Sequence, residues 1–230
     1  MRFLKHALAA LSLGFVALTA GASPASPQAG VDYRVLDKAI PTEAGKKVEV
    51  IEFFWYACPH CYAFDPSLTE WVKKHGDTIA FKRIPVNFRD SFVPQQKLFY
   101  ALEAMGKGDE LHSKIFDAIH KQHERLDTDA SVIDWVAKQG IDKQKFTDLY
   151  NSFAVQTKVR RATQLQQQYQ VDGVPLLAVE GRFETAPSIA GSTLGNQPEP
   201  ALHAATLQVM DFLVAKVAKE KGAGAPAAKK

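Results

Sequence analysis

The chain has two cysteines, and they lie three residues apart in the tetrapeptide Cys58-Pro59-His60-Cys61. A disulfide that closes so short a loop restricts the unfolded chain little, so we do not expect a structural cross-link. A closed zinc site needs four ligands, and the sequence offers no second cysteine pair, only scattered histidines such as His75, His120 and His123. The spacing therefore favours a redox-active dithiol, and we expect no metal.

The sequence around this dithiol predicts a strand before it and a helix after it. Residues 47–55 are rich in β-branched and aromatic side chains, which is typical of a buried strand. From Pro59 onward the apolar residues follow helical spacing, and proline suits the first helical position because its missing N–H would have no partner there. We therefore expect Cys58 at a helix N-terminus and Cys61 one turn inside, with both sulfurs on one face.

A helix N-terminus would activate Cys58 chemically. The thiolate is the reactive form of cysteine, and unpaired backbone N–H groups together with the helix dipole stabilise a negative sulfur. His60 can add a positive charge or a hydrogen-bond donor, and the alternative interpretation is a solvated helix residue. We take Cys58, Pro59, His60 and Cys61 as candidate catalytic residues.

The N-terminal segment 1–22 has the pattern of a secretory signal peptide. Arg2, Lys5 and His6 precede an apolar run over residues 7–20, and Ala20-Gly21-Ala22 fits a cleavage site. An uncleaved anchor is the alternative. We expect the remainder to be soluble and exported to an oxidising compartment.

Composition and charge limit the partners. The 230 residues carry 28 Lys+Arg and 25 Asp+Glu, a formal net charge of +3. Two of the positive charges belong to the segment 1–22, so the rest of the chain is nearly neutral. This balance does not indicate binding to nucleic acid.

Four short segments of the chain form a recognisable set: Glu52-Phe53-Phe54, Cys58-Pro59-His60-Cys61-Tyr62, Pro85-Val86-Asn87-Phe88 and Gly173-Val174-Pro175. In order and spacing they resemble the DsbA family of periplasmic thiol:disulfide oxidoreductases, and the match extends over residues 31–221. The resemblance implies an α/β, thioredoxin-like fold with an inserted helical domain and an intrinsic redox-active disulfide that needs no dissociable cofactor. It also implies oxidation of newly exported proteins in the periplasm and reoxidation by a membrane quinone-linked partner of the DsbB kind.

The resemblance adds candidate residues outside the tetrapeptide. In the family the bond matching Val174-Pro175 is cis and faces the dithiol, which makes these two residues the substrate-binding candidates; a trans proline at a strand start is the alternative. The family acid matching Glu52 is buried near the inner cysteine, which implies a proton relay, with an exposed edge position as the alternative. Arg83 could pair with Glu52 or be a surface charge, and we expect Asp65 to be a surface charge.

Patterning along the rest of the chain agrees with a helical insertion. We expect a thioredoxin-like domain over residues 31–90 and 164–221, an inserted helical domain over 91–163 and a flexible tail over 222–230. Within the first domain, the sequence predicts a strand at 79–86, a hairpin around Glu180-Gly181 and a closing helix at 201–219. We expect the polar residues 164–170 to be a solvated helix face.

On these grounds we expect the protein to be a monomeric dithiol oxidase. It would donate its Cys58–Cys61 disulfide to unfolded exported proteins through a mixed disulfide at Cys58. One alternative is a reductase or isomerase, although we find no separate dimerisation domain of the kind that isomerases usually carry. The other alternative is an export chaperone in which the cysteines are incidental.

Overall fold

The computed structural model describes residues 26–222, so the signal-peptide prediction and nearly all of the tail prediction lie outside the described residues. Five strands form one sheet in the order β1-β5-β4-β2-β3. Only β2 and β3 are parallel, and the other neighbouring pairs are antiparallel. The strands are β1 (Arg34–Val35), β2 (Val48–Phe54), β3 (Ile79–Pro85), β4 (Leu176–Val179) and β5 (Phe183–Thr185). The helices are α1 (Pro59–His75), α2 (Val93–Ala104), α3 (Gly108–His120), α4 (Asp129–Lys138), α5 (Lys143–Tyr150), α6 (Phe153–Gln168), α7 (Pro187–Ala190) and α8 (Glu199–Glu220), with a short 3-10 turn, η1 (Asp90–Phe92).

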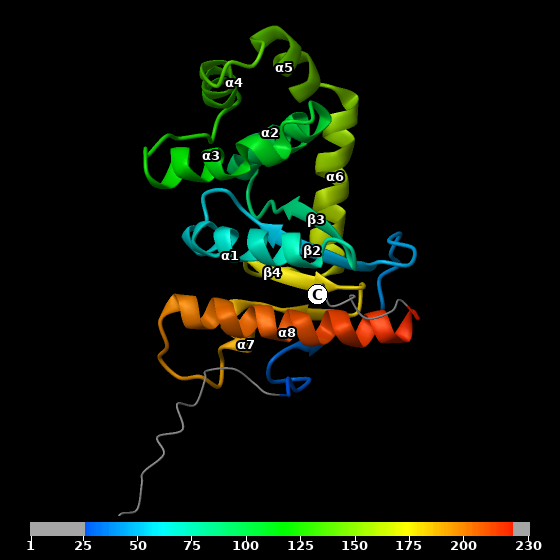
Figure 1. Cartoon of the computed structure of the whole chain (residues 1–230). Helices are drawn as coiled ribbons and strands as arrows, with labels where there is room; N and C mark the ends of the chain where they lie inside the picture. The colour runs from blue at the N-terminus through cyan, green and yellow to red at the C-terminus, as the bar shows by residue number, and fades with distance from the viewer. Residues whose placement is uncertain (1–25, 223–230) are drawn as a thin grey trace, which may run out of the picture.

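Strand β2 is buried on both faces, as its apolar sequence predicts. Its alternate residues enter two different cores. Val48 and Val50 pack with residues of α1 and α8, whereas Ile51 and Phe53 pack with residues of the helical part of the chain. Figure 1 shows α8 on one side of the sheet and α2–α5 stacked on the other.

The connection from β2 to β3 is helix α1, as parallel neighbouring strands require a crossover. This unit positions the dithiol, because Cys58 follows the carboxyl end of β2 and Pro59 begins the helix. The predicted strand, dithiol and helix are therefore all present in the predicted order.

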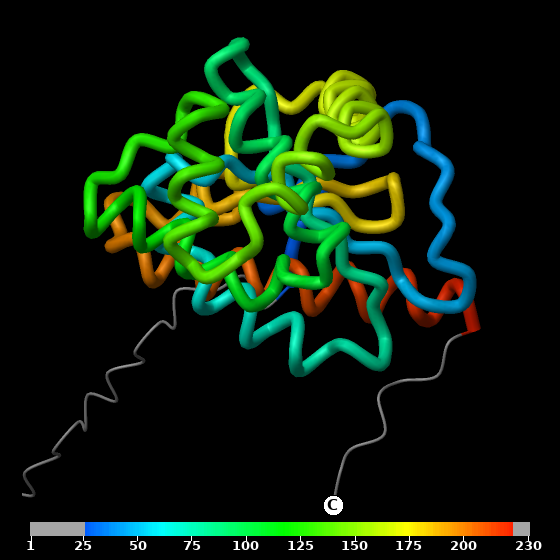
Figure 2. The backbone as a smooth tube through the Cα atoms, turned by 90° about the horizontal axis from the view of Figure 1, so that it is seen from above, coloured from blue at the N-terminus to red at the C-terminus, as the bar shows by residue number. Residues whose placement is uncertain are grey.

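Helix α6 joins the helical part to the sheet, and in Figure 2 it is seen end-on. It runs without a break through residues 163 and 164, where we expected a domain boundary. The expectation of a solvated face over residues 164–170 holds only in part. The exposed residues are Gln164, Gln167, Gln168 and Gln170, whereas Gln166 and Tyr169 are buried, and the helix ends at Gln168. Gln166 is buried because its amide bonds the backbone of Asn87, accepting from the N–H at 2.7 Å and donating to the carbonyl at 3.3 Å.

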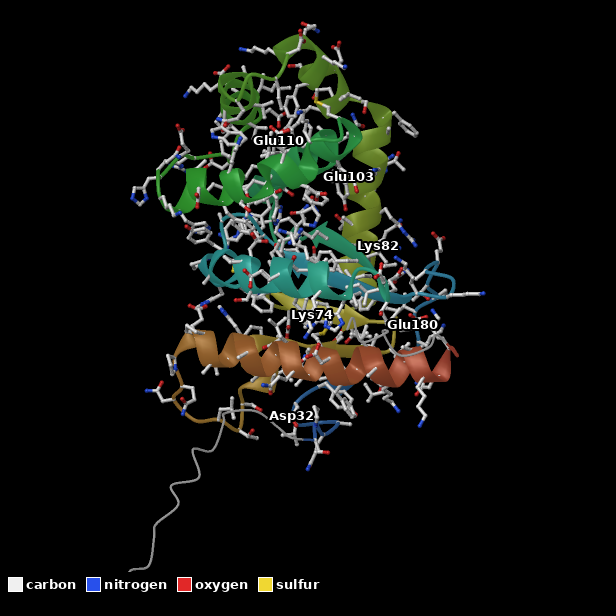
Figure 3. The ribbon with its side chains drawn as sticks, in the orientation of Figure 1. Asp32, Lys74, Lys82, Glu103, Glu110 and Glu180 are labelled. Carbon is white, nitrogen blue, oxygen red and sulfur yellow. The ribbon has the colours of Figure 1, made fainter. Side chains whose placement is uncertain are left out.

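The predicted hairpin turns at Glu180 and Gly181, which both have positive φ, 51° and 62°. A Cβ atom at Gly181 would lie 2.0 Å from the carbonyl oxygen of Ile40, so only glycine fits there. The Glu180 carboxylate accepts hydrogen bonds from Thr42 Oγ1 at 3.0 Å and from Lys221 Nζ at 2.6 Å. Figure 3 shows Glu180 at this end of the sheet, close to the end of α8.

Helix α8 has 22 residues and, by length and composition alone, could cross a membrane. Its apolar residues are instead part of the core, where Val209, Leu213 and Val217 are almost fully buried against the sheet and α1. We therefore assign it as the closing helix of the fold, as the pattern over residues 201–219 predicts.

Candidate active site

Cys58 caps the N-terminus of α1 with its own sulfur. Its backbone is extended (φ −81°, ψ 118°), and Sγ accepts a hydrogen bond from the backbone N–H of Cys61 at 3.4 Å. Both cysteines are free thiols; Cys58 is 7% exposed and Cys61 is fully buried. Only the outer sulfur is therefore placed for attack by another protein.

The two thiols differ in their tendency to ionise. The hydrogen bond from the Cys61 thiol is the largest effect lowering the pKa of Cys58, which falls to about 6 against the opposing effect of burial. The backbone N–H groups of Cys61 and His60 lower this pKa further, and the charge of His60 contributes least. Burial and the neighbouring Cys58 raise the pKa of Cys61 well above its ordinary value. At neutral pH the pair is therefore a Cys58 thiolate beside a Cys61 thiol.

His60 is largely exposed and is held from a different part of the chain. Its Nδ1 lies 2.8 Å from Oε1 of Glu199, the first residue of α8. This hydrogen bond raises the pKa of His60, which keeps the ring positively charged to higher pH. Glu199 was not predictable as this partner, because it is 139 positions from His60 and no local pattern connects them.

The Val174-Pro175 bond is cis, as the resemblance implies, and it borders the dithiol. When protonated, the Cys58 thiol donates to the carbonyl oxygen of Val174, with Sγ 3.5 Å from the oxygen. Beside them is a cavity of about 410 Å³ whose lining includes His60, Val174, Pro175 and Leu202. The outer sulfur therefore lies at the border of an open groove.

Glu52 is buried on the face of β2 that α1 covers, so its alternative as an exposed edge residue is excluded. Arg83 on β3 donates to it, with Nε 2.8 Å from Oε2. Burial is the largest influence and raises the pKa of Glu52 to about 7, although the charge of Arg83 acts in the opposite direction. The charge of Glu52 contributes to the raised pKa of Cys61, after the larger effects of burial and of Cys58.

The expectation that Asp65 is a surface charge is wrong. Asp65 lies on the buried face of α1 and is 4% exposed, because it accepts a second hydrogen bond from Arg83, with Nη2 at 3.0 Å from Oδ1. His112 on α3, which sequence reasoning missed, also contacts this carboxylate, with Nε2 at 3.2 Å from Oδ1. Isolated polar residues on amphipathic helices give no signal of such a cluster, since its members come from four separate elements.

Two of the three histidines considered as metal ligands have other partners. His75 lies 3.0 Å from Asp211, and Nε2 of His120 lies 2.8 Å from the carbonyl oxygen of Tyr56. Over residues 26–222, His, Cys, Asp and Glu side chains form no group of three or more that could hold a metal ion.

Comparison with known proteins agrees with this geometry. The model of the DSBA-like thioredoxin domain family matches residues 80–206. The thiol:disulfide interchange protein DsbA of Burkholderia cepacia is 48% identical over 212 residues, which is 92% of this chain and 95% of that protein. The chain belongs to the DsbA family.

Solved structures of the family have the same fold. Pseudomonas aeruginosa DsbA superposes with a TM-score of 0.76 at 35% identity, covering 85% of this chain and 97% of that one. Reduced DsbA1 from Neisseria meningitidis gives a TM-score of 0.70 at 28% identity, covering 87% of this chain and 100% of the other. The predicted thioredoxin-like fold with inserted helices is therefore confirmed, and the protein is a thiol:disulfide oxidoreductase.

Proposed function

We propose that the protein is a dithiol oxidase that donates its Cys58–Cys61 disulfide to newly exported proteins. The observation that carries this proposal is the difference between the two thiols: Cys58 borders the groove with a pKa of about 6, and Cys61 is fully buried with a raised pKa. A stabilised Cys58 thiolate favours the reduced form, and therefore makes the disulfide oxidising.

The reaction proceeds by two thiol–disulfide exchanges. A substrate thiolate attacks Sγ of Cys58, the bond to Cys61 breaks, and Cys61 leaves as a thiolate that takes up a proton. The second substrate thiolate then attacks the substrate sulfur of this mixed disulfide and expels Cys58 as a thiolate. The substrate loses two electrons and gains a disulfide, and the protein's disulfide becomes a dithiol.

The residues around the dithiol take separate roles in this proposal. Pro59 begins α1 and leaves the N–H groups that follow it to stabilise the Cys58 sulfur. His60 adds a positive charge, and Val174 and Pro175 border the groove where an extended substrate segment would lie. Glu52 acts as the proton donor and acceptor for Cys61.

The cellular setting follows from the resemblance and the relatives. We infer a periplasmic protein whose segment 1–22 is removed, which acts as a monomer without a dissociable cofactor. Its substrates are unfolded exported proteins with free thiols, and a quinone-linked membrane partner of the DsbB kind reoxidises it. In this proposal residues 91–163 are the helical insertion and 222–230 a flexible tail.

The test is the redox state of the dithiol together with its activity. Cells are quenched in acid and free thiols are alkylated, and we expect Cys58 and Cys61 to be mostly oxidised. The purified oxidised protein should then oxidise an equimolar reduced, unfolded substrate with two cysteines, and Cys58→Ser should not. A dithiol that is mostly reduced in cells would instead indicate a reductase or isomerase. The protein would instead be a chaperone if the wild type oxidises no substrate and the Cys58→Ser variant still prevents unfolded chains from aggregating.

A further inference from the structure

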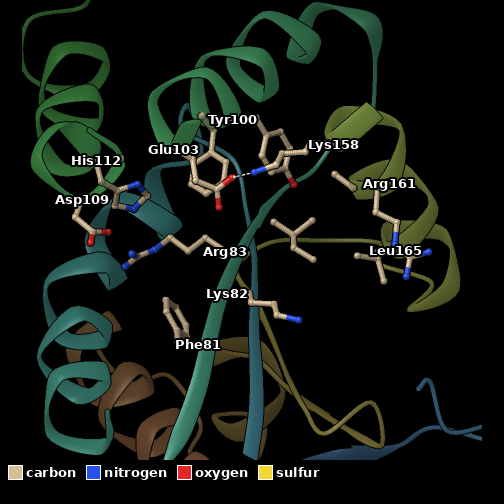
Figure 4. Close-up of a pocket in the computed structure, with 14 residues that line it drawn as sticks. Phe81, Lys82, Arg83, Tyr100, Glu103, Asp109, His112, Lys158, Arg161 and Leu165 are labelled. Carbon is tan, nitrogen blue, oxygen red and sulfur yellow. Dashed lines mark hydrogen bonds and ion pairs between the residues drawn. The ribbon is translucent and has the colours of Figure 1, made fainter. Parts of the chain in front are cut away.

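A second cavity, of about 380 Å³, lies where the edge strand β3 meets the helices α2, α3 and α6. Arg83, Asp109 and His112 are among its lining residues, and neither cysteine is (Figure 4). The groove beside Val174 and Pro175 shares no lining residue with this cavity. The cavity therefore reaches the buried charges from a different side than the groove does.

A continuous set of contacts leads from this cavity to the acid beside the inner cysteine. His112 Nε2 lies 3.2 Å from Asp65, Asp65 accepts from Arg83 at 3.0 Å, and Arg83 donates to Glu52 at 2.8 Å. Glu52, Asp65 and His112 are each at most 5% exposed. The His112 Nε2 is not aligned for a hydrogen bond with Asp65 and has no other partner, whereas Nδ1 lies 3.0 Å from Tyr56 Oη.

The charges in this buried cluster balance only if it holds one mobile proton. Arg83 stays positive and Asp65, with its lowered pKa, stays negative, so the two cancel. Two protonation states then give the cluster zero net charge. In one, Glu52 is protonated and His112 is uncharged; in the other, Glu52 is a carboxylate and His112 is an imidazolium. Any other state buries an uncompensated charge, which is costly.

We propose that the cavity is the solvent port of this buried cluster, and that His112 gains a proton when Glu52 gives its proton to Cys61, so that the cluster always holds one mobile proton. His112 is thus a positioning residue that acts on Cys61 through Glu52. The proposal rests on the proposed oxidase function, because that reaction requires Cys61 to gain a proton.

The proton balance is simple. When Cys61 leaves as a thiolate, the Glu52 carboxyl gives it a proton and becomes a carboxylate. His112 takes up, through the cavity, the proton that the substrate thiol released to solvent when it ionised, and becomes an imidazolium, which restores neutrality without any proton passing through Arg83. The groups that face His112 are Tyr56 from the loop after β2, Asp65 from α1, Arg83 from β3, and Asp109 one turn earlier on α3.

The experiment follows the two proton positions separately in the reduced full-length protein without substrate. The Glu52 carboxyl is titrated by infrared difference spectroscopy, and the His112 ring by NMR. In His112→Gln the Glu52 midpoint should rise by about one pH unit, because no imidazolium can compensate its charge. In Glu52→Gln the His112 midpoint should fall by a similar amount, since the coupling between two sites is reciprocal.

His75→Gln is the matched control, because His75 also lies 3.0 Å from an aspartate but belongs to a different contact set. It should leave the Glu52 midpoint unchanged. An unchanged His112 midpoint in folded Glu52→Gln overturns the proposal even if His112→Gln does not fold. If the Glu52 and His112 titrations are independent but the protein still oxidises dithiols, only the proposal for the cavity and His112 is rejected. If the two titrations are coupled but the protein oxidises no dithiol, the proposed oxidase function is rejected instead.

Discussion

Cys58 owes most of its acidity to its own turn of helix. The largest contributions come from the thiol and N–H of Cys61, and the charge of His60 contributes least. His60 is also 69% exposed, so water screens its charge. The outer sulfur is therefore activated mainly by the Cys61 thiol and, after it, by the backbone N–H groups of the first turn of α1, which Pro59 begins.

Replacing His60 should accordingly have a small effect. In His60→Leu we expect the pKa of Cys58 to rise by about half a unit from about 6, because one weak stabiliser of the thiolate is lost. The ultraviolet absorbance of the thiolate, followed against pH, measures it. Lys73→Leu removes a positive charge at the far end of the same helix and should leave the midpoint unchanged. A rise of two units would show that the imidazolium dominates.

Glu52 should make the folded protein less stable as the pH rises. Its pKa is about 7 in the fold against an ordinary 4.5, so the folded state binds more protons between these values and stability falls through this window. Glu52→Gln cannot ionise, so its stability should not fall through this window as that of wild type does. The unfolding free energy of the variant minus that of wild type should therefore increase by roughly 2–3 kcal/mol from pH 5 to pH 8. Urea unfolding at both pH values measures this. The exposed Glu110→Gln is the control, and parallel curves for Glu52→Gln and wild type would contradict the raised pKa.

At the level of elements, the polar contacts of α6 hold the helical part to the end of β3. Gln166 satisfies both backbone groups of Asn87, at 2.7 and 3.3 Å. Gln166→Leu leaves them without these partners and should cost about 1–3 kcal/mol. Gln164→Leu, an exposed position on the same helix, should change stability little. Chemical denaturation of the two variants compares them directly, and equal stabilities would show that water replaces the amide.

These elements also show what the sequence can predict. Strand β2, helix α1 and the hairpin follow from local composition and spacing, so the positions of Cys58 and Cys61 were predictable. Asp65 and Gln166 were misjudged because a polar residue on a helix gives the same pattern whether it faces water or a buried partner. The partner of Asp65 is on β3 and that of Gln166 follows β3, so only the folded chain brings them together.

For the whole molecule, reduction of the dithiol should change stability in a pH-dependent way. The reduced protein carries a Cys58 thiol whose pKa is about 6 when folded and about 8.5 when unfolded, whereas the oxidised protein has none. A lowered acid pKa stabilises the fold fully above the unfolded value, and the effect disappears as pH falls through the folded value. The unfolding free energy of the reduced form minus that of the oxidised form should therefore increase by about 1 kcal/mol from pH 5 to pH 7. Denaturant unfolding of both forms at these pH values checks this, and a difference that does not vary with pH would contradict it.

The two ends of helix α8 lie at different distances from the dithiol. The helix begins at Glu199, in contact with His60, and ends at Glu220. At 1.5 Å per residue, its 22 residues span about 33 Å. A fluorophore or a surface linker joined just past Glu220 would thus be held a full helix length from the groove. The protein can be immobilised there while its reactive sulfur stays open to large unfolded chains.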